Sequence, residues 1–177
     1  FSGRGQMFEA ELRYKTKNSN TVFEVANMEK DDIVGKNRHA YFFRDNRVFE
    51  NNLKLKNNGR WEGTHISSNI DIGGISDLTY FNDFGSTVSR VGRTHIKRQA
   101  EINRLDYGSF GSLETSLKTT DYQLAKEELT EQYSVLPQAR ASFNTHEKNK
   151  ELKYNLDAEI SIFSHTYGSK TDGTRVV

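Results

Sequence analysis

Few side chains in this sequence have the type and spacing that catalysis needs. Asp83-Phe84-Gly85 has the order of the magnesium-binding triplet of protein kinases, but no glycine-rich phosphate loop and no His-Arg-Asp motif accompany it. Glu127, Glu128 and Glu131 could act as paired carboxylates, yet they lie in a polar segment where solvated charges are the simpler interpretation. We therefore predict that the chain is not an enzyme.

Residues that bind metals or nucleic acids are equally dispersed. Cysteine is absent, which excludes thiolate cages for zinc or iron–sulfur clusters within this segment, and we expect no cofactor. The histidines lack the spacing of a metal site and are predicted to be solvated. They are His39, His65, His95, His146 and His165. The formal net charge is +1 and basic residues are interspersed with acidic ones, so nucleic acid is not an expected partner.

The clearest structural signal is a strict alternation over residues 152–162. The even-numbered residues are apolar and the odd-numbered ones are polar, which is typical of a β-strand with two unlike faces. At roughly 3.3 Å per residue this strand is about 36 Å long and, tilted by about 45°, covers about 26 Å of height. That height matches the apolar band of a transmembrane barrel, whereas strands of soluble proteins are usually shorter, about 5–6 residues.

Other segments repeat this pattern along the chain. Strands are predicted over residues 5–16, 60–73, 87–107, 113–119 and 133–144. Asn57-Asn58-Gly59 lies between two extended runs, and Asn-Gly in that position predicts a hairpin. Asp172-Gly173 predicts a last turn near the end of the sequence.

Two apolar segments have no clear phase. In 21–28 and in 38–49 large apolar residues occupy both parities, so these strands can present aromatic side chains on either face. We expect loops in the intervening stretches, with the aromatic residues of the second loop packed back on the loop itself. These loops are residues 29–37, 75–86 and 126–131.

The segments together predict an all-β fold: an antiparallel meander of about eight or nine long strands that forms part of a large transmembrane outer-membrane β-barrel. A single partial barrel domain would occupy residues 1–177. The mean hydropathy of -0.80 is low for a large sealed core but suits a sheet with one face in a wet lumen. Two alternatives stay open, a generic outer-membrane barrel such as a porin and a soluble β-rich binding module.

Several motifs point to one family when they are taken in order. They are Gly3-Arg4-Gly5, Glu11-Leu12-Arg13-Tyr14, Asp32 to Arg38, Ser76 to Ser86 with Tyr80, Phe81, Asp83, Phe84 and Gly85, Thr94-His95, and Tyr133 to Gln138 with Leu136, Pro137 and Gln138. This series resembles the barrel domain of the LptD family, the lipopolysaccharide-assembly outer-membrane proteins also called organic solvent tolerance proteins. The resemblance extends from about Gly3 to Val176.

The resemblance implies a function and a set of partners. Members of the family form a large closed barrel that is plugged by the lipoprotein LptE and joined to a periplasmic jelly-roll, and lipopolysaccharide leaves it sideways between the first and last strands. The implied role is lipopolysaccharide transport and assembly in the outer membrane of a Gram-negative bacterium. The implied partners are lipopolysaccharide, an LptE-like plug lipoprotein, the periplasmic lipopolysaccharide-bridge proteins and the barrel-assembly machinery.

The family's N-terminal jelly-roll, gate strand and C-terminal barrel strands are not found in these residues. We therefore expect an internal section of the barrel with two open edges, and we assign no lipid exit within it. In the strand at 152–162 the predicted lumen-facing residues are Lys153, Asn155, Asp157 and Glu159. The predicted lipid-facing residues are Leu152, Tyr154, Leu156, Ala158, Ile160 and Ile162.

Overall fold

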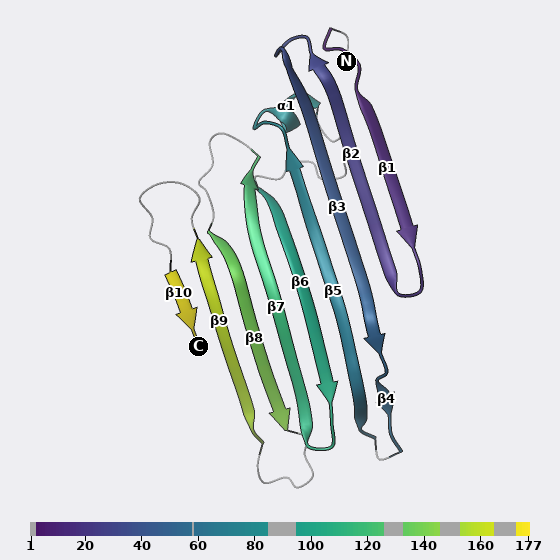
Figure 1. The fold of residues 1–177 in the computed structure, drawn as a ribbon, viewed down its shortest axis with the longest axis vertical. Coiled ribbons are helices and arrows are strands. Elements are labelled where there is room, and N and C mark those ends of the chain that lie inside the picture. The colour runs from purple at the N-terminus through teal and green to yellow at the C-terminus, as the bar shows by residue number, and fades with distance from the viewer. Residues whose placement is uncertain (1–2, 58, 85–94, 126–132, 146–152, 165–172) are drawn as a thin grey trace.

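The structure is a computed structural model that describes residues 3–57, 59–84, 95–125, 133–145, 153–164 and 173–177. In these residues the chain is mostly antiparallel strand (Figure 1). The strands are β1 (Phe8–Lys15), β2 (Ser19–Asp31), β3 (Lys36–Asn51), β4 (Lys54–Leu55), β5 (Trp61–Ile75), β6 (His95–Tyr107), β7 (Gly111–Leu124), β8 (Ser134–Thr145), β9 (Asn155–Ser164) and β10 (Gly173–Val176). A short helix, α1 (Tyr80–Phe84), follows β5.

All strands belong to one ten-stranded sheet that follows the chain as a meander. The order is β1-β2-β3-β5-β6-β7-β8-β9-β10, and β4 pairs with β5 beside this path. Each pairing is antiparallel, which confirms the predicted all-β meander. Within the described residues the sheet is not closed, so β1 and β10 lie at its two edges. Across the same ranges, no helix is long and apolar enough to cross a membrane.

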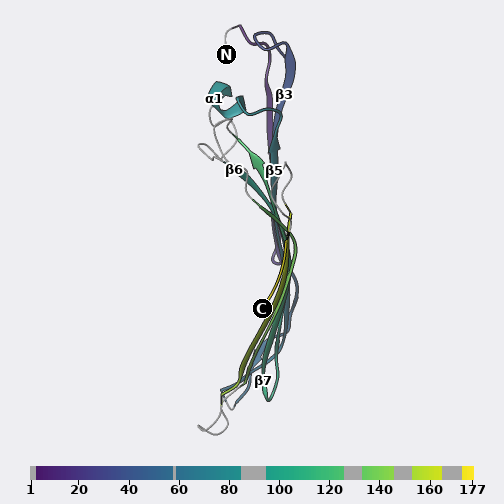
Figure 2. The same ribbon diagram turned by 90° about the vertical axis from the view of Figure 1, so that its left-hand side faces the viewer.

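Seen edge-on, the sheet is a single curved layer (Figure 2). The helix α1 stands to one side of this layer, near the end of the sheet at which the chain begins. No other helix or strand in the described ranges forms a second layer. The sheet therefore has one face that carries α1 and an opposite face that none of the described elements covers.

The predicted hairpin at Asn57 to Gly59 is confirmed. It joins β4 to β5, in which Leu55 pairs with Trp61, and the backbone N–H of Lys56 donates to the carbonyl of Arg60 at 2.7 Å. Gly59 has φ +75°, a left-handed conformation that glycine adopts without steric cost.

The loop predicted over residues 29–37 is present but shorter, limited to residues 32–35. Strand β2 continues to Asp31 and β3 begins at Lys36, so the connection is a tight turn. The carboxylate of Asp31 accepts the backbone N–H of Ile33 at 3.0 Å, and the carbonyl of Asp31 accepts the N–H of Gly35 at 2.6 Å. The charged residues of this stretch suggested a long loop, but the exposed ends of strands can carry charges too. Hydrogen bonds from the backbone to Asp31 hold the short turn in place.

The stretch predicted as an aromatic loop, residues 75–86, contains α1. Its aromatic rings do pack on one another: the ring centroids of Tyr80 and Phe81 are 5.8 Å apart, and those of Tyr80 and Phe84 are 5.0 Å apart. The same rings also pack against the sheet, which the sequence did not indicate. Residues 126–131 and Leu152 lie outside the described residues, and the strand predicted from 152 begins at Asn155.

The buried apolar core is small and lies under α1. Its members come from β2, β3, β5, α1, the start of β6 and the residue that follows β7. They are Ala26, Met28, Ala40, Phe42, Ile75, Tyr80, Phe81, Phe84, Ile96 and Ala125. This local core explains the unclear phase of β2 and β3, because both of their faces are apolar where the helix covers one of them.

Strands β5 and β6 separate at the end of the sheet that carries α1. Their ladder ends at the pair Asp71–Gln99, while β5 continues beside β3 to Ile75. Polar side chains occupy the gap: Nε of Arg98 donates to the carbonyl of Gly73 at 2.9 Å, and Nε2 of Gln123 donates to the carbonyl of Ile75 at 2.8 Å. The carbonyls of Gly73 and Ile75 thus accept hydrogen bonds from side chains where the ladder between β5 and β6 has ended.

Candidate functional site

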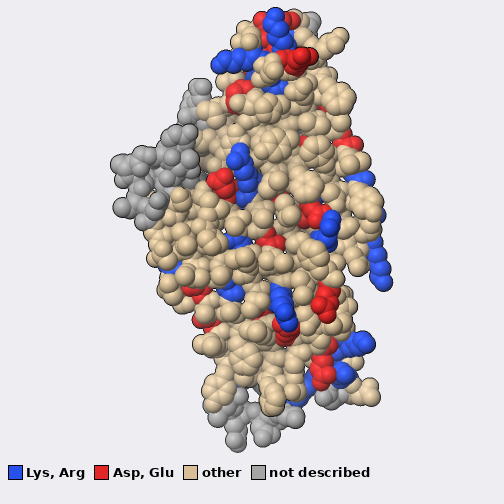
Figure 3. All heavy atoms as spheres, viewed as in Figure 1, with Lys and Arg blue, Asp and Glu red and all other residues tan. Residues whose placement is uncertain are grey.

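The first functional feature is the face opposite α1, which we call the apolar face. Directly paired residues form apolar rows across neighbouring strands on it. One row is Leu12, Phe23, Phe43 and Ile72. Another is Ile102, Leu117, Ala139, Ile160 and Val176. Figure 3 views this face, on which charged side chains are scattered among uncharged ones. Leu12 is 65% exposed and Ile160 is 47% exposed, so large apolar side chains stand uncovered here.

The second feature is the face that carries α1, which we call the polar face. A single row of directly paired residues crosses all nine strands of the main path, and every member is polar or charged. From β1 to β10 the row is Lys15, Asn20, Asn46, Asn69, Glu101, Lys118, Gln138, Ser161 and Arg175. This polar row offers hydrogen-bond donors and acceptors continuously across the sheet.

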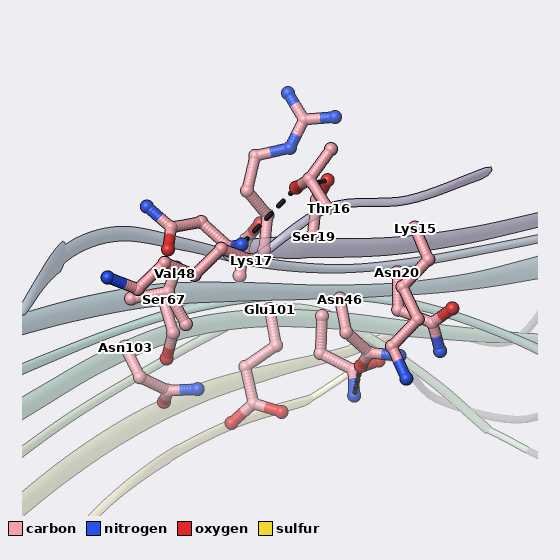
Figure 4. A pocket seen from close by; sticks show the side chains of 14 residues that line it. Lys15, Thr16, Lys17, Ser19, Asn20, Asn46, Val48, Ser67, Glu101 and Asn103 are labelled. Carbon is pink, nitrogen blue, oxygen red and sulfur yellow. Dashed lines mark hydrogen bonds between the residues drawn. The ribbon is translucent and has the colours of Figure 1, made fainter.

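Part of the polar row lines a shallow hollow near the turn between β1 and β2. Its volume is about 440 Å³, and its lining is rich in asparagine and serine (Figure 4). Within it, Nδ2 of Asn69 donates to Oδ1 of Asn46 at 2.8 Å, a cross-strand amide contact. In the part of the chain that the structure describes, no group of three His, Asp or Glu side chains is arranged to hold a metal ion. The hollow is an open part of the sheet surface with amide and hydroxyl side chains in its lining.

The residues predicted to face lumen or lipid fall on these two faces. Asp157 and Glu159 belong to the polar face, because they pair with Ser142 and Arg140 of β8. On the apolar face of β9 are Leu156, Ala158, Ile160 and Ile162. Asn155 begins β9 on the polar side, Lys153 and Tyr154 precede the strand, and Leu152 lies outside the described residues. The structure thus separates the two sets, while which face meets lipid stays a prediction.

Charged residues do interrupt the apolar face, but as pairs. Nε of Arg47 lies 3.4 Å from Oδ2 of Asp45, and Nε of Arg104 lies 2.7 Å from Oδ2 of Asp106. Thr64 donates a further hydrogen bond to Asp106 at 2.7 Å. Pairing with a carboxylate on the same strand lowers the cost of holding an arginine on a largely apolar surface.

The third feature is a cluster of charged residues around Arg38, which sequence analysis did not single out. Arg38 lies in β3 and its side chain is 1% exposed. Its guanidinium donates to both oxygens of Asp77, at 2.8 and 2.9 Å, to Asp31 at 3.2 Å, and to Asp83. Arg4 closes the cluster, with nitrogens 2.8 Å from Asp31 and 3.0 Å from Asp83. We call these five residues the Arg38 cluster.

Aromatic rings of α1 cover the same guanidinium. The central carbon of Arg38 lies 4.6 Å from the ring centroid of Phe84 and 5.7 Å from that of Tyr80. Arg4 lies 5.5 Å from the Phe84 ring. These distances are in the range of cation–π contacts, which strengthen when water is excluded. The charge of Arg38 is thus balanced by carboxylates and by aromatic faces from the same short segment.

Both carboxylates from the segment after β5 are held ionised. Hydrogen bonds from Arg38 lower the pKa of Asp83 below its usual value, and the positive charge of Arg4 adds to this effect. Burial would raise the pKa of Asp77, but hydrogen bonds from Ser76, Thr79 and Arg38 outweigh it and hold that pKa below its usual value. The ion pairs with Arg38 therefore persist at neutral pH.

The predicted motif residues lie at two separate places. Tyr80, Phe81, Asp83 and Phe84 form α1 and contact the Arg38 cluster or the core, while Gly85 lies outside the described residues. Leu136, Pro137 and Gln138 lie in β8, where the ladders to β7 and β9 both shift register. Proline cannot donate to a ladder, which suits that irregular position. The unclear phase of β2 and β3 was a sequence signal for the apolar core beside the cluster, but it does not identify the charged residues.

Comparisons with known proteins agree on one family. The family model described as "LptD: LPS transport system D" matches residues 36–177. The chain is 30% identical over 144 residues to LPS-assembly protein LptD of Idiomarina loihiensis, which covers 81% of this chain and 17% of that protein. It is 26% identical over 194 residues to the protein of the same name from Saccharophagus degradans, covering 99% of this chain and 21% of the relative.

A third relative, LPS-assembly protein LptD of Nitrosospira multiformis, is 28% identical over 183 residues, which covers 99% of this chain and 18% of that protein. The chain thus spans about a fifth of the length of the curated relatives it matches. The family model covers most of the chain, and the name LptD recurs in each relative. This chain therefore belongs to the LptD family of LPS transport system proteins.

Proposed function

We propose that this chain forms a section of the wall of an outer-membrane β-barrel that inserts lipopolysaccharide into the outer leaflet. The observation that carries the proposal is the pair of unlike faces, with apolar rows on one side and the polar row on the other along the whole sheet. A barrel wall needs one face for lipid and one for a wet lumen. The relatives, named LPS-assembly proteins, supply the substrate class.

Lipid is the environment that suits the apolar face best. Water would be a poor solvent for a contiguous surface of this kind, which usually marks a contact with protein or membrane. A soluble module would cover it with a second sheet, and no such sheet occurs among the described residues. We assign Leu156, Ala158, Ile160 and Ile162 to the lipid side, and Asp157 and Glu159 to the lumen.

The position of the charge pairs supports a tilted arrangement of strands. One row of the apolar face holds Ile160 in β9 and Ile102 in β6, but holds Arg47 in β3. The apolar stretch of β3, around Tyr41 and Phe43, lies nearer the α1 end of the sheet. If the strands are tilted, the apolar band of the membrane meets each successive strand at a different height along its length. The shift of the apolar stretch between β9 and β3 fits such a tilt, and we infer that Arg47 lies at the border of the band.

The proposed barrel is completed by other parts of a longer protein. The two open edges at β1 and β10 would pair with further strands, because exposed strand edges promote aggregation if they are left open. We further propose that the polar face meets an LptE-like plug lipoprotein, and that the periplasmic bridge proteins and the barrel-assembly machinery act on the whole protein. The described residues form one partial barrel domain in this proposal.

Cysteine labelling in cells tests which face meets lipid. Ile160→Cys and Glu159→Cys are introduced singly into the full-length protein, because neighbouring residues of β9 alternate between the faces. A water-soluble maleimide small enough to enter the lumen should label position 159 and leave position 160 unlabelled, because a thiol in lipid stays protonated and only the thiolate reacts. The unsubstituted protein gives the background. Water-soluble labelling of position 160 alone would reverse the assignment and contradict the proposal.

Co-purification and depletion separate this function from that of a porin. A plug lipoprotein should co-purify with the full-length protein, and depletion of the protein should lower the amount of lipopolysaccharide at the cell surface. A barrel that purifies alone and whose depletion leaves surface lipopolysaccharide unchanged would instead be a general pore.

A further inference from the structure

The helix α1 lies on the polar face, where the proposed barrel would have its lumen (Figure 2). Under α1 this face of β2 and β3 carries apolar residues, and Met28 and Ala40 are fully buried. Further along β3 the same face carries Arg44, which is exposed. The change from polar to apolar residues at these positions coincides with the contact with Tyr80, Phe81 and Phe84. The sheet is thus adapted to hold the helix.

The attachment of α1 combines an apolar contact with a charged one. Tyr80 and Phe84 are at most 4% exposed and pack on the core, while Asp77 before the helix and Asp83 within it bind the guanidinium of Arg38. A planar guanidinium with five donors fixes orientation as well as distance when it contacts several carboxylates. Because Arg38 itself sits in β3, the segment from Asp77 to Phe84 is tied to the barrel wall at a defined position.

We propose that α1 is a fixed wedge that projects from the wall and narrows the passage lined by the polar face, and that Arg38 is the residue that positions it. This inference rests on the proposed function, because it requires the polar face to line a lumen. Without Arg38, the aromatic rings of α1 would still pack on the core, but the hydrogen bonds of the guanidinium to Asp77 and Asp83 that orient the helix would be lost. The wedge would then move away from the wall position that the structure shows, and the passage would widen.

Ion conductance of the full-length protein in planar lipid bilayers measures the width of the passage. Three variants are compared with the unmodified protein, each purified with the partners that accompany it. Arg38→Ala removes the positioning residue. In a second variant residues 80–84 are replaced by glycine and serine, which removes the wedge itself. Arg44→Ala is the control, because it removes the same charge from the same strand and face but outside the Arg38 cluster.

Conductance should rise in Arg38→Ala and in the replaced variant by clearly more than in Arg44→Ala, which removes a charge from the same face without releasing the helix. Unchanged conductance in both test variants would overturn the wedge while leaving the barrel intact. If Arg38→Ala does not insert, the replaced variant decides, since it retains Arg38. If the unmodified protein neither inserts nor conducts, the proposed function itself is overturned. This result differs from one in which the variants insert and conduct as the unmodified protein does, which overturns only the wedge.

Discussion

The guanidinium of Arg38 and the carboxylate of Asp77 meet through two hydrogen bonds, from Nη2 at 2.8 Å and from Nε at 2.9 Å. Their geometry is the fork-to-fork contact that gives arginine its specificity for carboxylates. The two residues are 39 positions apart in the chain and come from β3 and from the segment after β5. A strand of the sheet is thereby joined to the element that lies on its face.

Replacing Arg38 should destabilise the protein. Arg38→Ala leaves the carboxylate of Asp31, which is fully buried, with fewer donors, and removal of one partner from a buried ion pair typically costs about 3 kcal/mol or more. The urea midpoint of the full-length protein should fall. Arg38→Lys keeps the charge but not the fork, so its midpoint should be intermediate. Equal midpoints for Arg38→Ala and Arg44→Ala would contradict this role.

Acid should release α1 before it affects the sheet. Asp77 and Asp83 have pKa values below the ordinary 3.8, so their ion pairs contribute stability that is fully present above that value. This stability is lost as the pH falls through the lowered folded pKa values, because the carboxylates then become protonated. Hydrogen–deuterium exchange should show loss of protection in residues 76–84 below about pH 4. Loss of protection on raising the pH from 5 to 8 would be the opposite of this prediction.

A charge should be tolerated on one face of β9 and not on the other. Ile160→Arg places a charge among the apolar rows and should weaken insertion by about 2–4 kcal/mol if the position lies near the middle of the membrane. Glu159→Arg lies on the polar face beside Arg140 and should have a smaller effect. The fraction of full-length protein that resists unfolding in detergent gives the comparison. Similar losses for the two variants would count against the assignment of faces.

Gly73 should not accept a side chain. A Cβ at this position would overlap the ring of Phe42, which pairs with Gly73 across the β3–β5 ladder and is buried under α1. Gly73→Ala should lower the free energy of unfolding by about 1–3 kcal/mol through overpacking. Gly173→Ala is the matched control, since no atom lies within 4 Å of its added Cβ. A neutral Gly73→Ala would mean that Phe42 moves aside without loss of packing.

The sequence predicted the sheet because the alternation depends on neighbours in the chain. In β9, strict alternation identified both faces, and in the hairpin before β5 the residue pair Asn58-Gly59 was sufficient. The phase of β3 could not be assigned, because Phe42 packs under a helix from a later segment while Phe43 faces the opposite side. Periodicity in one strand does not reveal a partner that is distant in sequence.

The cluster itself was outside the reach of local patterns. Arg4, Asp31 and Arg38 each look like ordinary surface charges in the sequence, and their burial follows only from the arrival of Asp77 and Asp83. The helix α1 spans five residues and has too few turns to show a helical period. Sequence reasoning therefore recognised the aromatic motif and the motif that ends at Arg38, but not the contact between them.

The ion pair between Arg4 and Asp83 also has a consequence for how the chain folds. These residues are 79 positions apart, and the entropy lost in closing a loop grows with its length. Contacts between distant residues form slowly and late compared with those within a hairpin. Asp31 lies beside Arg38 at the turn between β2 and β3, whereas Asp77 and Asp83 reach the guanidinium only once β5 has paired with β3. Until that pairing is made, the turn holds an arginine whose charge is only partly balanced.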